Sequence, residues 1–108
     1  MKRYHVRLTE EAERDLVDLF EYIARKDSVD HAYGVLEKLE ALIFSLDQQP
    51  ERGHYPPELN KRGVKDYREV HFKPHRVIYE MIRNHVVILV CFDGRRDMQL
   101  LLERRLLR

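Results

Sequence analysis

Four arginines in the C-terminal half of the sequence have the type and spacing of an anion-binding group: Arg68, Arg76, Arg95 and Arg96. The first two fall in consecutive segments with strand-like alternation, and the other two follow a third such segment. A guanidinium stays protonated and offers a planar fork of donors that fits a phosphate or a carboxylate. If the strands pair as hairpins, the four side chains lie within one or two strand spacings of about 4.8 Å. The pattern predicts a target-contacting surface; the alternative is that each arginine is a solvated edge charge or pairs with an acid such as Glu69.

Two histidines, His71 and His75, flank a short Lys73-Pro74 turn. They could act in acid–base chemistry, because histidine titrates near neutral pH. As metal ligands they would need a third donor, and no cysteine or carboxylate cluster stands nearby in the sequence. Histidines exposed on a turn are the simpler interpretation. The sequence also has no phosphate-cradling glycine loop, so we expect no cofactor and no metal site, and these patterns alone assign no catalytic residue.

The length and composition of the chain predict one domain, residues 1–108. Of its 108 residues, 44% are hydrophobic and 36% are charged, as in a well-solvated globular protein. The longest apolar run, from Val86 to Phe92, is far shorter than the ~20 residues that cross a bilayer. Cys91 lies within that run and is the single cysteine, so no intramolecular disulfide forms. These features predict a cytoplasmic location.

The charge is unevenly distributed along the chain. The first 54 residues carry eight basic and twelve acidic side chains, and the remaining 54 carry twelve and seven, for a net charge of +1. A protein that binds polyphosphate usually carries a larger positive excess. The balance therefore favours a protein partner over bulk nucleic acid.

Hydrophobic periodicity predicts the elements that position these residues. Residues 4–8 alternate as a strand, and two amphipathic helices follow, with Thr9 and Ser28 as N-caps. Residues 48–63 contain three of the four prolines and Gly63 and are predicted as a loop. Three antiparallel strands follow at about 64–72, 75–83 and 85–92, and then a terminal helix or tail at 97–107. The predicted fold class is α+β, in the order β-α-α-β-β-β. The N-terminal strand joins an antiparallel sheet at its edge or beside the last strand, and the helical hairpin packs on one face.

Several short motifs, taken in order, resemble the RelE/ParE toxin superfamily. They are Asp66-Tyr67-Arg68-Glu69, Pro74-His75-Arg76-Val77-Ile78-Tyr79-Glu80, Val87-Ile88-Leu89 and Asp93-Gly94-Arg95-Arg96-Asp97. Its ParE branch is resembled further by Asp15-Leu16, Glu21-Tyr22-Ile23-Ala24 and Gln49-Pro50-Glu51-Arg52-Gly53. The resemblance covers nearly the whole chain. It implies the toxin of a bacterial type II toxin–antitoxin pair, which inhibits growth, contributes to plasmid stabilisation and is neutralised by a small cognate antitoxin.

The two branches of this superfamily imply different targets. RelE-like members cut messenger RNA in the ribosome with basic residues and a C-terminal acid–base group, whereas ParE-like members inhibit DNA gyrase and are not enzymes. Arg76 sits at the arginine position that both branches keep, and Arg68 and Arg96 fall near basic positions of the RelE branch. Residues 98–107 contain no tyrosine, histidine or aspartate. This departure favours the gyrase inhibitor, with Arg68, Arg76, Arg95 and Arg96 in contact with the target.

Two alternatives stay open. A metal-independent mRNA endonuclease would use Arg68, His71, His75, Arg76 and Arg96, and an inactive toxin remnant would only bind the antitoxin. The C-terminal leucines either pack on the sheet or form part of a groove for an antitoxin helix. In the second case Leu101, Leu102 and Leu106 are the expected antitoxin contacts.

Overall fold

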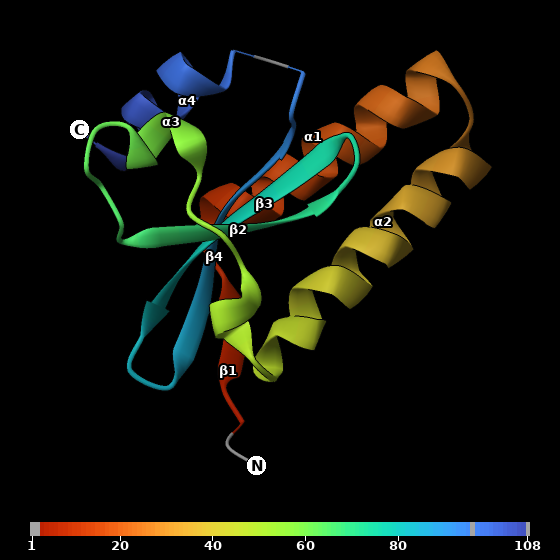
Figure 1. Ribbon diagram of the computed structural model, residues 1–108. Helices are drawn as coiled ribbons and strands as arrows, with labels where there is room; N and C mark the ends of the chain where they lie inside the picture. Colours follow the sequence, from red (N-terminus) through yellow and green to blue (C-terminus); the bar gives the residue numbers. More distant parts are fainter. Residues whose placement is uncertain (1–2, 96, 108) are drawn as a thin grey trace.

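A computed structural model describes residues 3–95 and 97–107 of the chain (Figure 1). Its centre is a four-stranded sheet in the order β1-β4-β3-β2. The strands are β1 (His5–Leu8), β2 (Tyr67–Phe72), β3 (His75–Ile82) and β4 (His85–Asp93). Short turns make β2, β3 and β4 antiparallel neighbours, as predicted. β1 lies beside β4 at the edge of the sheet but runs parallel to it, so the sheet is mixed rather than antiparallel.

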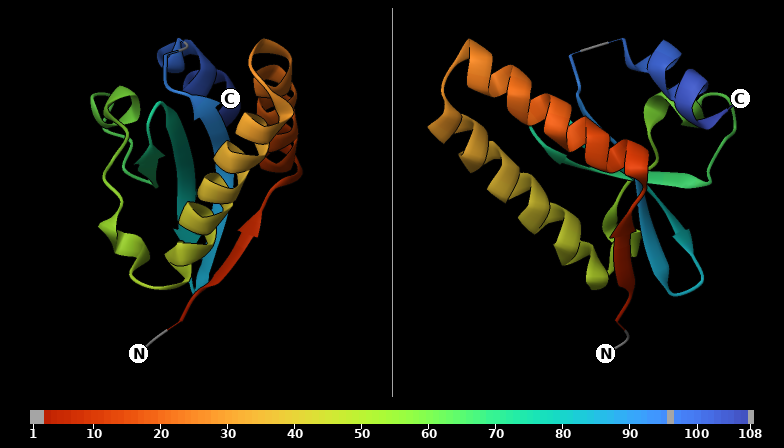
Figure 2. Two further views of the ribbon diagram at one scale, coloured as in Figure 1. Left: turned by 90° about the vertical axis from the view of Figure 1, so that its right-hand side faces the viewer. Right: turned by 180° about the vertical axis from the view of Figure 1, so that it is seen from behind.

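The helical hairpin forms as the periodicity predicted. Helix α1 (Glu10–Lys26) begins where the Thr9 hydroxyl oxygen accepts from the Ala12 amide, at 3.1 Å. Helix α2 (Val29–Phe44) begins in the same way at Ser28. Such caps satisfy amides that have no partner inside the helix. Figure 2 shows the two helices together on one side of the sheet.

The main core lies between this hairpin and the sheet. Its fully buried side chains come from α1, α2, the following 3₁₀ turn η1 (Ser45–Asp47) and the central strands. They include Ala12, Leu39, Ile43, Leu46, Val77, Tyr79, Val86 and Ile88. Because side chains alternate along a strand, the same strands present a second set of residues to the opposite face.

That opposite face is covered by helices as well, from the segment before β2 and from the C-terminus. A short helix α3 (Pro57–Asn60) forms inside the predicted loop, after the 3₁₀ turn η2 (Pro50–Arg52), with a proline at its first turn. The C-terminal helix α4 (Met98–Leu106) packs beside α3. A second apolar core fills the space beneath them: Leu59, Ile78, Val90, Met98 and Leu102. The apolar content of residues 98–107 is thus explained by a second face of the sheet that needs covering.

The edge of β4 beyond β1 is closed by side chains instead of a strand. β1 pairs only as far as Ile88, and β4 then bulges at Leu89, which has no partner on β3. The Leu89 carbonyl accepts from the Arg105 guanidinium at 2.7 Å, and the Cys91 amide donates to the Asp15 carboxylate at 3.0 Å. Arg105 also forms a bidentate ion pair with Asp15, in which Nη1 and Nη2 donate to Oδ1 and Oδ2 at 3.1 Å each. This pair, which we call the edge latch, joins α1, β4 and α4.

No helix within residues 3–95 and 97–107 is long and apolar enough to cross a membrane.

Candidate functional site

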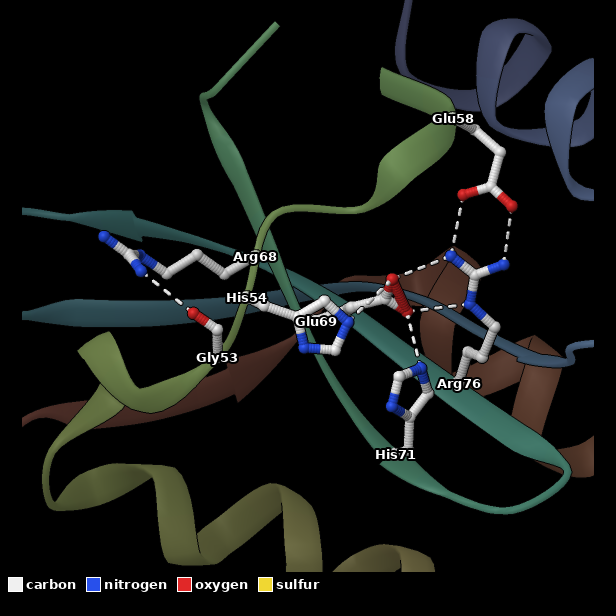
Figure 3. Close-up of polar contacts among 7 residues, drawn as sticks. All are labelled: Gly53, His54, Glu58, Arg68, Glu69, His71 and Arg76. Carbon is white, nitrogen blue, oxygen red and sulfur yellow. Dashed lines mark hydrogen bonds and ion pairs between the residues drawn. The ribbon is translucent and has the colours of Figure 1, made fainter. Parts of the chain in front are cut away.

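A buried carboxylate on β2 gathers charged groups from three segments of the chain (Figure 3). The Glu69 side chain is only 1% exposed. Its Oε1 accepts from Arg76 Nε at 2.7 Å and its Oε2 from Arg76 Nη2 at 2.8 Å. His71 Nε2 lies 3.0 Å from Oε1, and His54 Nε2 lies 3.4 Å from Oε2. Acid–base groups, an anion-binding guanidinium and a buried acid therefore meet at one point.

The strand register explains why these residues share one face. His71 is the cross-strand partner of Arg76, and Glu69 stands two residues before His71. Side chains with this spacing project from the same face, which is the face covered by α3 and α4. His54 comes from the segment before α3. Its amide donates to the Glu69 carbonyl at 3.2 Å and its carbonyl accepts from the Glu69 amide at 2.7 Å, an isolated bridge that extends the sheet.

Gly53 allows this segment to approach the sheet so closely. A Cβ on Gly53 would lie 2.9 Å from the Glu69 carbonyl oxygen and would collide with the Tyr79 hydroxyl. That hydroxyl is buried and donates to the Pro50 carbonyl at 2.5 Å. Only a residue without a side chain fits between β2, Tyr79 and the turn at Pro50.

Arg76 binds a second carboxylate with the other side of its guanidinium. Nη1 and Nη2 donate to Oε2 and Oε1 of Glu58, on α3, at 2.8 Å each. The hydrogen bonds that Arg76 donates to Glu58 raise the pKa of Arg76 above its usual range and lower the pKa of Glu58. The Arg76 side chain is 11% exposed. While the histidines are neutral, two carboxylates face one guanidinium, and the cluster carries one excess negative charge.

The other predicted arginines lie elsewhere. Arg68 projects from the opposite face of β2, because it alternates with Glu69, and donates to the Glu51 and Gly53 carbonyls. Its guanidinium also stacks on the Tyr55 ring at 4.9 Å. Arg95 is exposed and pairs with Asp93, two residues away. Arg96 lies outside the described residues. The structure therefore does not bring Arg68 and Arg76 together, and their role in target contact stays a prediction.

The two predicted histidines point to different surroundings. His71 joins Glu69, whereas His75 is buried on the hairpin side, beside Phe72 and near Asp93 and Arg95. Burial lowers the pKa of His75. Its Nδ1 finds no hydrogen-bond partner among the described residues. His71 is therefore the member of the pair that the structure places in the site.

The C-terminal leucines are mostly occupied within the protein itself. Leu102 is fully buried in the second core, and Leu101 and Leu106 pack against it. Leu100 is the large apolar residue of α4 that is exposed, at 52%.

A larger apolar surface lies between α1 and α2, in a groove of about 550 Å³. Three large apolar side chains that line it are more than half exposed: Val17, Tyr33 and Phe44. Three acidic residues also line it: Glu13, Glu21 and Glu40. The groove therefore presents an apolar floor with negative charge around it.

Comparison with known proteins identifies the family. Residues 6–98 match the family model described as the ParE toxin of the type II toxin–antitoxin system parDE. The chain belongs to the ParE toxin family. It is therefore a toxin of the type II toxin–antitoxin class. A search of curated protein sequences found no match.

Two solved structures share the fold. A chain of the chromosomal ParDE toxin–antitoxin system from P. aeruginosa superimposes with a TM-score of 0.72 at 15% identity, covering 86% of this chain and 98% of that one. A chain of the RelBE2 toxin–antitoxin complex from Mycobacterium tuberculosis gives a TM-score of 0.63 at 23% identity, covering 84% and 98%. At these identities the two structures establish the α+β fold, with its mixed sheet, and nothing finer.

The sequence reasoning missed His54, Glu58 and the central role of Glu69. From the sequence, Glu69 is only a possible neutralising neighbour of an arginine. His54 and Glu58 lie in the segment predicted as a loop, fifteen and eleven residues before Glu69. One feature could have singled out Glu69: an acid between Arg68 and Val70, in a strand whose partner strand carries an arginine.

Proposed function

We propose that this ParE-family toxin inhibits DNA gyrase in the bacterial cytoplasm and is neutralised by a cognate antitoxin. The observation that carries the proposal is the family match over residues 6–98, in a chain whose C-terminal helix offers no proton donor. Within α4, Arg105 is held in the edge latch and Glu103 pairs with Arg62 at 2.7 Å. The helix therefore acts as a structural cover of the sheet.

A supercoiling assay with purified gyrase tests the proposed target. We expect micromolar toxin to reduce supercoiling and the purified antitoxin to restore it. Unchanged gyrase activity at that concentration would exclude the target. Induced expression without antitoxin provides the companion test, because an inactive remnant would leave growth unaffected.

One observation favours a second candidate, an mRNA endonuclease. His54, His71 and Arg76 surround Glu69, and this set combines proton-transfer groups with a guanidinium. The geometry weighs against it, because two carboxylates already bind the Arg76 guanidinium, which is therefore not available to neutralise a phosphate. A translating extract separates the two candidates. Cleaved message that disappears in His71→Gln would support the endonuclease, and intact message would exclude it.

The antitoxin contact is best supported at the groove between α1 and α2. Its apolar floor and acidic lining fit an amphipathic antitoxin helix with lysine or arginine beside its apolar stripe. Val17→Lys and Tyr33→Lys should then weaken neutralisation. Val29→Lys is the matched control, because Val29 is 53% exposed on α2 and does not line the groove. If Leu100→Lys disrupts neutralisation instead, the C-terminal helix is the contact surface.

A further inference from the structure

We propose that His54, His71 and Glu69 form a binding site for a divalent transition-metal ion of the Zn²⁺ type. Each residue offers one ligand atom, and the three atoms lie within 4.8 Å of one another. This inference concerns metal binding alone and does not depend on the gyrase proposal.

The distances within the cluster suit a zinc-type ion. Two ligand atoms bound tetrahedrally to one Zn²⁺ at about 2.0–2.1 Å are separated by roughly 3.3 Å. His71 Nε2 and Glu69 Oε1 are 3.0 Å apart, and His54 Nε2 and Glu69 Oε2 are 3.4 Å apart. These two distances end on different oxygens of the carboxylate, so with Glu69 bound through one oxygen only one of them is already an edge of the coordination polyhedron. Moving the other imidazole towards the same oxygen is the adjustment that remains, and both histidine side chains are on the accessible side of the cluster.

The donor set selects the class of ion. Two imidazole nitrogens and one carboxylate suit Zn²⁺, Cu²⁺, Ni²⁺ or Co²⁺, whereas Mg²⁺ and Ca²⁺ prefer oxygen ligands throughout. Both histidines present the same atom, Nε2, to the carboxylate. Their side chains are 56% and 37% exposed, so an ion can enter from solvent, while Glu69 is fixed beneath them at 1% exposure.

Arg76 is compatible with this site and helps to position it. Its fork uses one lone pair on each oxygen of Glu69, and an ionised carboxylate has about four lone-pair sites. Hydrogen bonds of this kind orient metal-binding carboxylates. Glu58 compensates the charge of Arg76 on its other side, so the excess negative charge of the cluster remains available to a cation.

Such an ion would tie the segment around His54 to strand β2. Three protein ligands leave at least one coordination position open for water or for a donor from a partner. The site would therefore stabilise the approach of the segment before α3 to the sheet, and it would be exchangeable with solvent.

Titration calorimetry on untagged, chelator-treated protein tests the proposal, with ZnCl₂ as the probe. We expect saturable binding of one ion, a rise in the unfolding temperature with Zn²⁺, and d–d absorption bands with Co²⁺. His54→Gln and His71→Gln should each weaken Zn²⁺ binding by about tenfold or more. His31→Gln is the matched control, because His31 is an exposed histidine whose ring nitrogen lies 2.6 Å from the Asp27 carboxylate, and its affinity should equal that of the unaltered protein.

Two results would overturn the site. One is the absence of saturable Zn²⁺ binding to the unaltered protein at micromolar concentrations. The other is equal Zn²⁺ affinity in His54→Gln, His71→Gln and His31→Gln, which would place the ion elsewhere. Circular dichroism of each variant checks that a loss of binding does not come from a loss of folding, and a double variant His54→Gln/His71→Gln that folds and still binds Zn²⁺ with unchanged affinity would also refute the proposal.

Discussion

Replacing Arg76 by alanine should destabilise the fold, because this guanidinium neutralises two carboxylates at once. It donates to Glu69 through Nε and Nη2 and to Glu58 through Nη1 and Nη2, at 2.7–2.8 Å. Glu69 is 1% exposed and would be left without its opposite charge. Removing one member of a buried ion pair costs about 3–5 kcal/mol, against roughly 5–15 kcal/mol for the whole stability of a domain. Glu58 is 20% exposed and adds little, because water can solvate it.

Chemical denaturation and thermal unfolding measure this effect. For a domain of this size the expected fall in unfolding temperature is about 12–20 °C, at about 4 °C per kcal/mol. Arg95→Ala is the matched control, because Arg95 is 75% exposed and pairs with nearby Asp93; its unfolding temperature should not change measurably. The double variant Arg76→Ala/Glu69→Gln should be less destabilised than the sum of the two single changes, because it leaves no buried charge unpaired.

This reasoning would be refuted if the unfolding free energy of Arg76→Ala lay within about 1 kcal/mol of that of the unaltered protein. In that case the two ion pairs would contribute little, and Arg76 would be free to serve in target contact as the sequence predicted. If Arg76→Ala is strongly destabilised, its loss of toxicity cannot be read as a loss of contact. Arg76→Lys then becomes the informative toxicity variant, because it keeps the charge and removes the bidentate geometry.

The ion pair between Arg76 and Glu58 predicts how the unfolding free energy falls at acidic pH. Arg76, and to a lesser extent Lys61, hold the pKa of Glu58 below its ordinary value of 4.5. Because the folded-state pKa is the lower one, this stabilisation is fully present above pH 4.5 and is lost as the pH falls through the folded-state pKa. Glu58→Gln should therefore show a flatter decline of unfolding free energy below pH 4.5 than the unaltered protein. Parallel declines in the two proteins would contradict the assignment.

Two further substitutions and one reactivity measurement test the packing around the sheet. Gly53→Ala should cost about 1–3 kcal/mol in urea denaturation, because its Cβ has no room beside Tyr79; a neutral change would mean that the segment can move. Asp15→Ala should cost about 3 kcal/mol by the same assay, because it leaves the largely buried Arg105 with only the longer contact to exposed Glu11, at 3.6 Å, and an unchanged midpoint would show that the latch contributes nothing. Burial raises the pKa of Cys91 to about 12, so its thiol should react with a disulfide reagent only when the protein unfolds, and rapid reaction in native buffer would contradict that burial.

The features that could be predicted from the sequence are those that depend on residues close together in the chain. Thr9 and Ser28 cap the two helices because a capping hydroxyl needs only the amides three residues ahead. The three C-terminal strands followed from alternation and from the two short turns that join them. Helix α3 was missed because it is only four residues long, beginning at the second of two consecutive prolines, which is too short to show helical periodicity.

What the sequence did not predict depends on contacts between distant residues. The parallel pairing of β1 with β4 joins residues about eighty positions apart. The site is similar: Arg76 meets Glu58 because α3 folds over the sheet, and the His54 side chain meets Glu69 because an isolated bridge holds its segment against β2. From residue types alone, Arg76 was predicted to be available to a ligand. In the fold, both sides of its guanidinium bind carboxylates of the protein itself.

The edge latch occupies backbone groups through which a second chain could pair with the sheet. An uncovered strand edge presents unpaired amides and carbonyls on which a second chain can form a strand. Here the carbonyl of Leu89 and the amide of Cys91, on the part of β4 that β1 does not reach, are occupied by Arg105 and Asp15. As long as the C-terminal helix remains in place, these two groups are therefore not available for strand pairing with a second chain. Loss of that helix, by proteolysis or truncation, would convert the same strand into a template for aggregation.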